Sequence, residues 1–193
     1  TIDDPTKHFD TQIWTGNNNN PRSFSNTAFS PDFVWYKARN NSYANNLYDS
    51  IRGATKVLYS NTTAVEYTND TSGTLQSFDS DGFTVGGDSD VSTVNQNTGT
   101  YVGWQWRGSD STAASNTDGN IGTSTVSVNT TAGFSIGTYS GDNSDANKTV
   151  GHGLGAVPAM VIVKARDEVR HWLIWHKHLD DNDKALLFNN DAA

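Results

Sequence analysis

The chain has 193 residues, a formal net charge of −8 and no cysteine, which excludes disulfide bonds, cysteine-based zinc sites and thiol nucleophiles. Its 13 Lys and Arg residues form no cluster of the kind that neutralises a phosphate backbone, so we expect no nucleic-acid partner. No apolar stretch approaches the length of a membrane span, so we expect no membrane insertion.

The first half of the chain reads as a series of short strands. Residues 1–7 are polar and are interpreted as a lead-in segment. Short alternating or apolar runs follow, and clusters of Asn, Thr, Ser, Asp and Gly separate them, which is typical of strands and turns. The strands are predicted at 9–15, 33–36, 57–59, 75–78, 83–85 and 101–106. The last run alternates strictly, with one of its two faces expected in the core. We therefore predict an all-β fold with very little helix.

Residues 108–131 carry almost no large apolar side chains and are interpreted as a polar spacer. Val126 and Val128 alternate with Ser, so a short strand is allowed in the second half of this segment. Two further segments, 50–55 and 179–183, are predicted to form a helical turn or a tight loop.

Three sequence blocks occur twice in the same order, about 127 residues apart, which indicates a duplicated domain. The blocks are 9–16 with 134–141, 31–39 with 158–166, and 56–61 with 184–189. We therefore predict tandem β-sandwich (jelly-roll-like) domains, the first at 8–107 and the second at 132–193. Nothing in the second copy matches 80–86 or 101–106, so we expect it to contain the N-terminal part of a repeat alone.

Both copies of the 31–39 block end in a cationic triplet, Lys37–Arg39 in the first and Lys164–Arg166 in the second. These triplets follow apolar strands directly. We interpret them as structural cations that pair with the acidic loops or contact a neighbouring subunit.

Five phrases together carry a resemblance to a known group of proteins. They are DPTKHF at 4–9, PDFVWYK at 31–37, LYDSIRGATK at 47–56, FDSDGF at 78–83 and VGHGLGAVP at 150–158. They resemble the repeated β domains of large structural proteins from marine tailed phages, including cyanophages, which are usually described as tail-fibre-like. The resemblance implies a virion component with several such repeats, other virion subunits as partners and assembly into a homo-oligomer. It implies no enzymatic activity and supplies no catalytic residues.

Two acidic loops are candidate sites for a hard cation, because Ca²⁺ prefers oxygen ligands. Asp79 and Asp81 precede the predicted strand at 83–85, and Asp142 and Asp145 share one turn. The spacing does not match an EF-hand, since Gly82 follows Asp81 directly. Asp is also an ordinary turn residue. Turn chemistry without a cofactor is the favoured interpretation, and bound Ca²⁺ is the alternative.

Exposed aromatic side chains are the second kind of candidate site, because they can stack on sugar rings. Tyr36, Tyr43 and Tyr48 have polar sequence neighbours and are the predicted contacts for a host-surface glycan. The tryptophans of the apolar strand patterns are mostly expected in the core, namely Trp14, Trp35, Trp104 and Trp106.

The sequence contains no recognisable catalytic constellation. Its two glutamates, Glu66 and Glu168, lie at unmatched places in the repeat, and no pair of aspartates is singled out as an acid and base across a cleft. No Gly-x-Ser-x-Gly elbow is present. We therefore expect no enzyme in this segment.

The leading hypothesis is a virion structural protein, a tail-fibre or tail-associated repeat module that projects from a phage particle and aids attachment to the host surface. Repetition of such domains would multiply weak contacts. A glycan-binding, lectin-like module is the first alternative. The second is the N-terminal part of a polysaccharide depolymerase whose catalytic part lies beyond Ala193.

Overall fold

The computed structural model describes residues 2–68, 74–86, 94–109, 112–144, 147–179 and 184–190. Strands make up its regular structure, apart from one short 3-10 turn at Pro5–Lys7. The all-β prediction is confirmed, and strands occur at each of the six positions predicted in the first half of the chain. In the part of the chain that the structure describes, no helix is long and apolar enough to cross a membrane.

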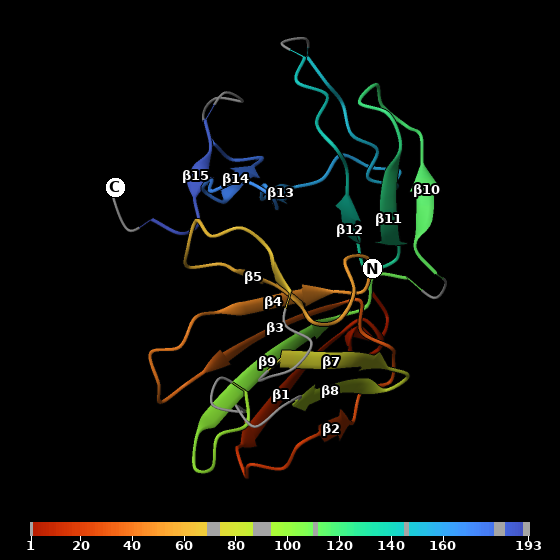
Figure 1. The fold of residues 1–193 in the computed structure, drawn as a ribbon. Helices are drawn as coiled ribbons and strands as arrows, with labels where there is room; N and C mark the ends of the chain where they lie inside the picture. Colours follow the sequence, from red (N-terminus) through yellow and green to blue (C-terminus); the bar gives the residue numbers. More distant parts are fainter. Residues whose placement is uncertain are drawn as a thin grey trace.

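The first unit is a β-sandwich built from nine strands of the described chain (Figure 1). One sheet has the order β1-β9-β3-β4-β5-β6 and the other has the order β2-β8-β7, and every pair is antiparallel. The strands are β1 (Phe9–Thr15), β2 (Arg22–Ser25), β3 (Phe33–Ala38), β4 (Asn46–Asp49), β5 (Lys56–Tyr59), β6 (Tyr67–Thr68), β7 (Thr74–Asp79), β8 (Gly82–Gly86) and β9 (Thr100–Trp106). The predicted sandwich is therefore confirmed for this unit.

The core of the sandwich lies between the two sheets and is rich in aromatic rings. Trp14 stacks on Tyr101 with ring centroids 5.2 Å apart and lies 4.7 Å from Phe24 of the opposite sheet. Gly103 makes room for this packing, because a Cβ there would come within 3.2 Å of the Trp14 ring. Large aromatic areas of this kind allow a chain with 34% hydrophobic residues to bury a core.

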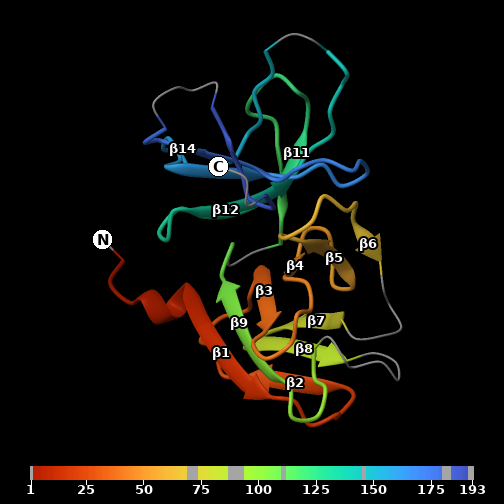
Figure 2. The same ribbon diagram turned by 90° about the vertical axis from the view of Figure 1, so that its left-hand side faces the viewer.

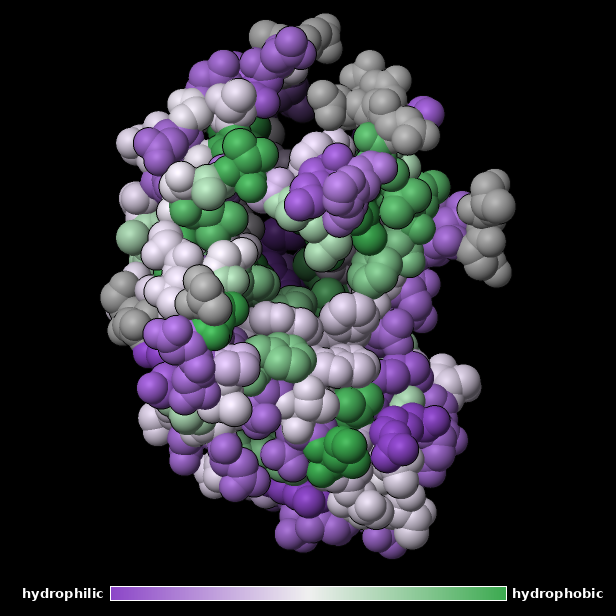
Figure 3. Space-filling model, turned by 180° about the vertical axis from the view of Figure 1, so that it is seen from behind, coloured by the Kyte–Doolittle hydropathy of each residue, from purple (hydrophilic) through white to green (hydrophobic). Residues whose placement is uncertain are grey.

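The second unit consists of two small antiparallel sheets, β10-β11-β12 and β13-β14-β15. Its strands are β10 (Ala114–Asn116), β11 (Ser124–Asn129), β12 (Phe134–Thr138), β13 (Met160–Val163), β14 (Leu173–His176) and β15 (Leu186–Leu187). In both ribbon views it sits on the end of the first unit next to β4 and β5 (Figure 1, Figure 2). Seen from behind, its surface has a hollow with apolar side chains on both sides (Figure 3).

The predicted spacer at 108–131 needs a correction. The strand around Val126 and Val128 forms, but it is β11, and β11 pairs with β12 from Thr125↔Thr138 to Asn129↔Phe134. A sheet needs backbone partners more than large side chains, so a run of Ser, Thr and Val joins it readily. The segment 108–131 therefore belongs to the second unit and does not merely separate two units.

The meander β3-β4-β5 recurs as β13-β14-β15 in the same register. Pairing in the first runs from Phe33↔Asp49 to Tyr36↔Asn46, and pairing in the second runs from Met160↔His176 to Val163↔Leu173. These pairs match at the spacing of the sequence repeat.

Local hydrogen bonds repeat as well. Asn61 Oδ1 accepts from the Asn45 backbone N–H at 3.0 Å, and Asn189 Oδ1 accepts from the Trp172 backbone N–H at 2.8 Å. The same hydrogen bond therefore occurs at equivalent places in the two meanders.

Candidate functional site

The prediction that Tyr36 and Tyr48 contact a glycan is wrong, because both side chains are fully buried. Their rings stack 5.6 Å apart inside the sandwich, and their hydroxyl groups share a hydrogen bond of 3.2 Å. The polar neighbours that suggested exposure lie on the opposite face of each strand or in the next turn. Tyr43 is half-buried, and its hydroxyl donates to Gln96 Oε1 at 3.3 Å. Tyr36 and Tyr48 therefore cannot stack on a sugar ring at the protein surface.

Because Tyr36 and Tyr48 are buried, we expect their hydroxyl groups to ionise late when the folded protein is titrated with alkali. Burial raises the pKa of Tyr36 and Tyr48 above the ordinary value of 10.0, whereas both ionise normally once unfolded. Stability that is present below pH 10 is therefore lost as the pH rises further, because the unfolded state releases protons that the folded state holds. We expect the phenolate absorbance to rise in an early step and then in a late step that coincides with unfolding.

Tyr48→Phe should reduce the late step, because it removes a fully buried phenol group. Ionisation of Tyr36 and Tyr48 near the ordinary value in the folded protein would contradict their burial.

The described aspartates of the two predicted cation sites form hydrogen bonds or an ion pair with other residues of the protein. Asp79 accepts hydrogen bonds from the hydroxyls of Ser77 and Thr84, both at 2.7 Å. Among the described residues, no three His, Asp or Glu side chains gather in a manner that could hold a metal ion. Asp81 is exposed in the turn between β7 and β8, and its carbonyl accepts from the Thr27 backbone N–H.

Asp142 closes its own turn by accepting from the Ser144 backbone N–H, and it pairs with Lys148 at 2.7 Å. The hydrogen bond from Lys148 lowers the pKa of the Asp142 carboxyl. Asp145 lies outside the described residues. The partners of Asp79, Asp81 and Asp142 are those of ordinary turn residues.

The most extensive arrangement of functional groups is the interface between the two units, and it starts from the outer face of the six-stranded sheet. Strand β9 buries Tyr101, Gly103 and Gln105 on its inner face. Its outer face carries Val102, Trp104 and Trp106, which are half-buried. Both faces of this sheet are therefore covered, one by β2-β8-β7 and the other in part by the second unit.

An aromatic layer fills this second contact. Phe134 of β12 lies 6.3 Å from both Phe33 and Trp106, and Phe188 lies 5.6 Å from Trp35 and 6.4 Å from Trp172, measured between ring centroids. Ring contacts of this geometry stabilise beyond their buried area.

Asp32 joins the two units at the start of β3. Its Oδ1 accepts from the hydroxyls of Ser50, at 2.6 Å, and Ser127, at 3.0 Å. Its Oδ2 accepts from the backbone N–H groups of Gly108 and Ser109 at 2.8 and 3.0 Å. One carboxylate therefore holds the chain leaving β9 and a residue of β11 at once.

Replacing Asp32 with asparagine should loosen this junction. The amide oxygen can still accept from the Gly108 and Ser109 N–H groups and the amide N–H₂ can donate to the two hydroxyls, but these hydrogen bonds lose the carboxylate charge that strengthens them, which costs about 1–2 kcal/mol in all. We expect the free energy of unfolding to fall by that amount and hydrogen exchange to quicken at Gly108 and along β11. Asp3→Asn, at an exposed carboxylate, is the matched control and should change neither. Equal exchange at Gly108 in both variants would show that Asp32 does not hold the junction.

A charged network forms a second attachment. Arg166, from the loop after β13, donates to Glu66 Oε2 from Nε at 3.0 Å and to Oε1 at 2.8 Å. Arg52 donates to the same Glu66 at 3.1 Å and also binds Asp49. Burial alone would raise the pKa of Glu66, but the hydrogen bonds from Arg166 and Arg52 outweigh it and hold that pKa below its usual value of 4.5.

This lowered pKa makes the interface sensitive to acid. The stabilisation from Glu66 is complete above pH 4.5, its value in the unfolded chain, and is lost as the pH falls through the lower folded value. Unfolding free energies measured between about pH 6 and about pH 3 should therefore fall less in Glu66→Gln than in the unmodified protein.

The matched control for this experiment is Glu168→Gln. Glu168 pairs with Arg170, but its side chain is 59% exposed, so its replacement should change the free energy of unfolding little. Identical slopes for Glu66→Gln and the unmodified protein would contradict a specific role for Glu66.

Trp172 forms the third attachment. It is 6% exposed and packs with Leu47 and Leu58 of the first unit, and its indole Nε1–H donates to the Tyr59 carbonyl at 2.9 Å. The side chain is therefore anchored by both an apolar pocket and one hydrogen bond.

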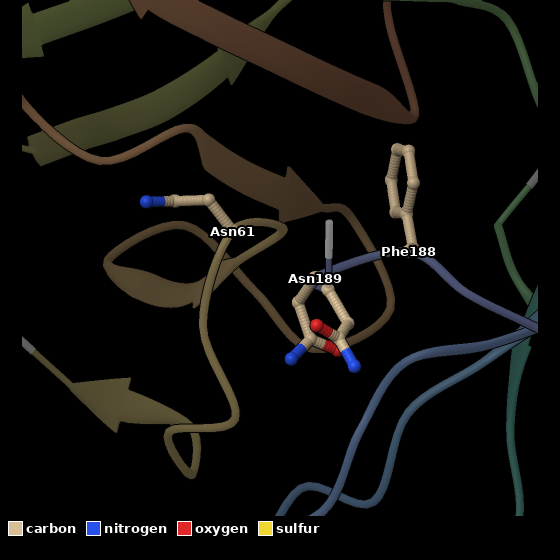
Figure 4. Close-up of a pocket in the computed structure, with 4 residues that line it drawn as sticks. Asn61, Phe188 and Asn189 are labelled. Carbon is tan, nitrogen blue, oxygen red and sulfur yellow. The ribbon is translucent and has the colours of Figure 1, made fainter. Parts of the chain in front are cut away.

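A pocket of about 410 Å³ lies beside this contact, lined by Asn61, Phe188, Asn189 and Asn190 (Figure 4). Asn61 and Asn189 each use their side-chain oxygen to hold a backbone N–H of the repeated meander. Phe188 is part of the aromatic layer. None of the described residues that line this pocket has a titratable side chain.

The sequence did not predict this interface, because each residue pattern that contributes to it also has a more ordinary explanation. Trp104 and Trp106 were expected in the core, and they instead cover the outer face of the sheet that forms the core. The repeated cationic triplet was predicted to pair with the acidic loops or to contact a neighbouring subunit, whereas Arg166 pairs with Glu66, which lies outside those loops and 100 positions away. The strict alternation of 101–106, with large residues on both faces, is the one signal that points to a sheet covered on both sides.

Comparisons with known proteins agree with the extent of this architecture. Residues 4–193 match a family described as a domain of unknown function, DUF7483, so the match spans both units and their interface. No curated protein and no solved structure matches the chain at a significant level. The chain therefore belongs to the DUF7483 family.

Proposed function

We propose that this chain is a structural module of a virion, a tail-fibre or tail-associated repeat that projects from a phage particle and helps it attach to the host surface. The observation that carries the proposal is the joint between the two units. Asp32, the Glu66 network and Trp172 tie the units at three separated points, with an aromatic layer between them.

Such a joint suits a mechanical role. Two domains in one chain normally move relative to each other unless their interface is large and apolar. Here the Asp32 and Glu66 carboxylates accept hydrogen bonds across the interface and hold the two units in one relative orientation. The aromatic rings packed between the units oppose bending. Modules connected in this way in series form a stiff projection that places its far end at a distance from the particle.

The described carboxylates favour this role over catalysis. Glu66 is bound by two arginines, and Glu168 pairs with Arg170. A glycosidase needs one carboxyl group with a raised pKa facing a second across a cleft. The pKa of Glu66 is shifted in the opposite direction. The resemblance of the repeat to tail-fibre-like phage domains supports the same assignment.

The direct test is to locate the chain on particles. Antibodies raised against residues 1–193 are applied to purified virions from cultures whose phage genome encodes the chain, and gold labelling is recorded by electron microscopy. We expect label on a fibre or on the tail. Preimmune serum and particles lacking the gene are the controls. Absence of the chain from purified virions, by labelling and by mass spectrometry, would overturn the proposal.

The attachment part of the proposal has its own test. The purified chain, labelled with a fluorophore, is added to host cells and to resistant cells, and bound fluorescence is measured. Saturable binding to host cells alone is expected. Equal or absent binding would leave a structural role and remove the adhesive one.

A further inference from the structure

The second unit exposes apolar residues that the first unit buries at matching positions. Val161 of β13 is 38% exposed, whereas Val34, its counterpart in β3, is 0% exposed. Leu186 of β15 is 54% exposed, whereas Leu58, its counterpart in β5, is 5% exposed because it packs against Trp172 of the second unit. The register of the two meanders is the same, so the difference comes from what covers them and not from how they fold.

The strand edges differ in the same way. In the first unit β9 pairs with β1 on one side and with β3 on the other. The counterparts of β1 and β3 are β12 and β13. Within the described residues, β12 pairs with β11 alone and β13 pairs with β14 alone. The second unit therefore lacks, in its described part, a strand that bridges these two edges.

The molecular surface of the described residues is consistent with a missing strand between β12 and β13. Figure 3 shows a hollow in the half of the molecule that holds the second unit, with apolar side chains on both sides. On the face that corresponds to the sandwich core, Val161 and Leu173 are 38% and 47% exposed, and on the opposite face Met160 and Ile162 are 53% and 43% exposed. An apolar sheet face next to an open edge is the usual receptor for an added strand.

We propose that the second unit is a docking site for a polypeptide segment that repeats the pattern of residues 74–106, with a hairpin of the β7-β8 type over the apolar face and a strand of the β9 type in the gap between β12 and β13. The first unit supplies the expected register. Trp104 lies opposite Trp35 and Trp106 lies opposite Phe33. A docked strand would therefore place its corresponding side chains opposite Ile162 and Met160.

The same comparison defines the chemistry of the occupant. The strand must alternate, with large apolar residues on its outer face and a small residue opposite Val163, where Gly103 lies opposite Tyr36. A folded second copy of this chain does not offer such a strand, because both edges of its own β9 are already paired. The inference rests on the internal repeat and is independent of a virion role.

The test supplies the segment in the same molecule. The chain is extended after Asn189, the counterpart of Asn61, by a second copy of residues 62–108. Apolar surface is measured by binding of the dye ANS, and backbone protection is measured by hydrogen exchange. We expect ANS fluorescence to fall at least about twofold and exchange along β12 and β13 to slow by about tenfold or more. Exchange along β1 should not change, which shows that the first unit stays folded.

A matched control carries lysine in the appended copy at the positions of Tyr101 and Trp104, and it should leave both signals at their starting values. Ile162→Lys in the extended chain should also abolish the gain in protection. An extension that changes neither signal would overturn the proposal. Concentration-dependent dimerisation of the original chain that protects β13 would also overturn it, because a second copy would then be the occupant.

Discussion

Replacing Arg52 with alanine is expected to lower the free energy of unfolding by about 3–5 kcal/mol, because it leaves the buried Asp49 carboxylate without its cation and takes one of two arginines from Glu66. The Arg52 side chain is 4% exposed, beside Asp49 at 6% and Glu66 at 13%. Its guanidinium also donates to the carbonyls of Leu47 and Lys56, at 3.1 and 3.2 Å. The variant therefore leaves Asp49 without its cation, leaves Glu66 with Arg166 alone, and removes the donor to two carbonyl groups. Denaturation by guanidinium chloride measures the change.

Two variants make this experiment specific. Arg39→Ala removes an exposed arginine and should cost well under about 1 kcal/mol. Arg52→Ala combined with Asp49→Ala should cost less than the sum of the two single variants, because one stranded carboxylate is then absent. Arg52→Ala with the stability of Arg39→Ala would show that the network contributes little.

Replacing Trp172 with alanine is expected to cost about 3–5 kcal/mol, the usual range for removing a buried tryptophan. The side chain fills the contact between the second meander and β4-β5 and donates to the Tyr59 carbonyl. We expect hydrogen exchange to quicken first along β13 and β14, while β1 and β9 keep their protection. The loss would thus separate the meander from the first unit before the sandwich unfolds.

Trp172→Phe separates packing from hydrogen bonding, since it keeps a ring but removes the indole N–H. It should retain most of the stability, with a cost of about 1 kcal/mol or somewhat more from the unpaired carbonyl. Val169→Ala, at a position 71% exposed, is the neutral control. Uniform loss of protection over both units in Trp172→Ala would contradict a local role at the interface.

The sandwich core illustrates why the burial of side chains was harder to predict than the positions of strands. Tyr36 and Tyr48 have polar sequence neighbours, yet they occupy alternate inward positions in β3 and β4 and meet inside the sandwich. Their hydroxyls satisfy each other, which makes burial of two phenol groups tolerable. A single polar neighbourhood in sequence does not reveal such a reciprocal partner on another strand.

The sequence by itself determined the strands, because alternation and turn residues act over a few positions, and it determined the repeat, because matched blocks keep their order and spacing. The recurring register of β3-β4-β5 and β13-β14-β15 follows from those blocks. Only the tertiary structure decided which face of β9 is the core, that β11 pairs with β12, and that Glu66 meets Arg166. These contacts join residues far apart in the chain, and their free energy depends on desolvation and packing that no local pattern encodes.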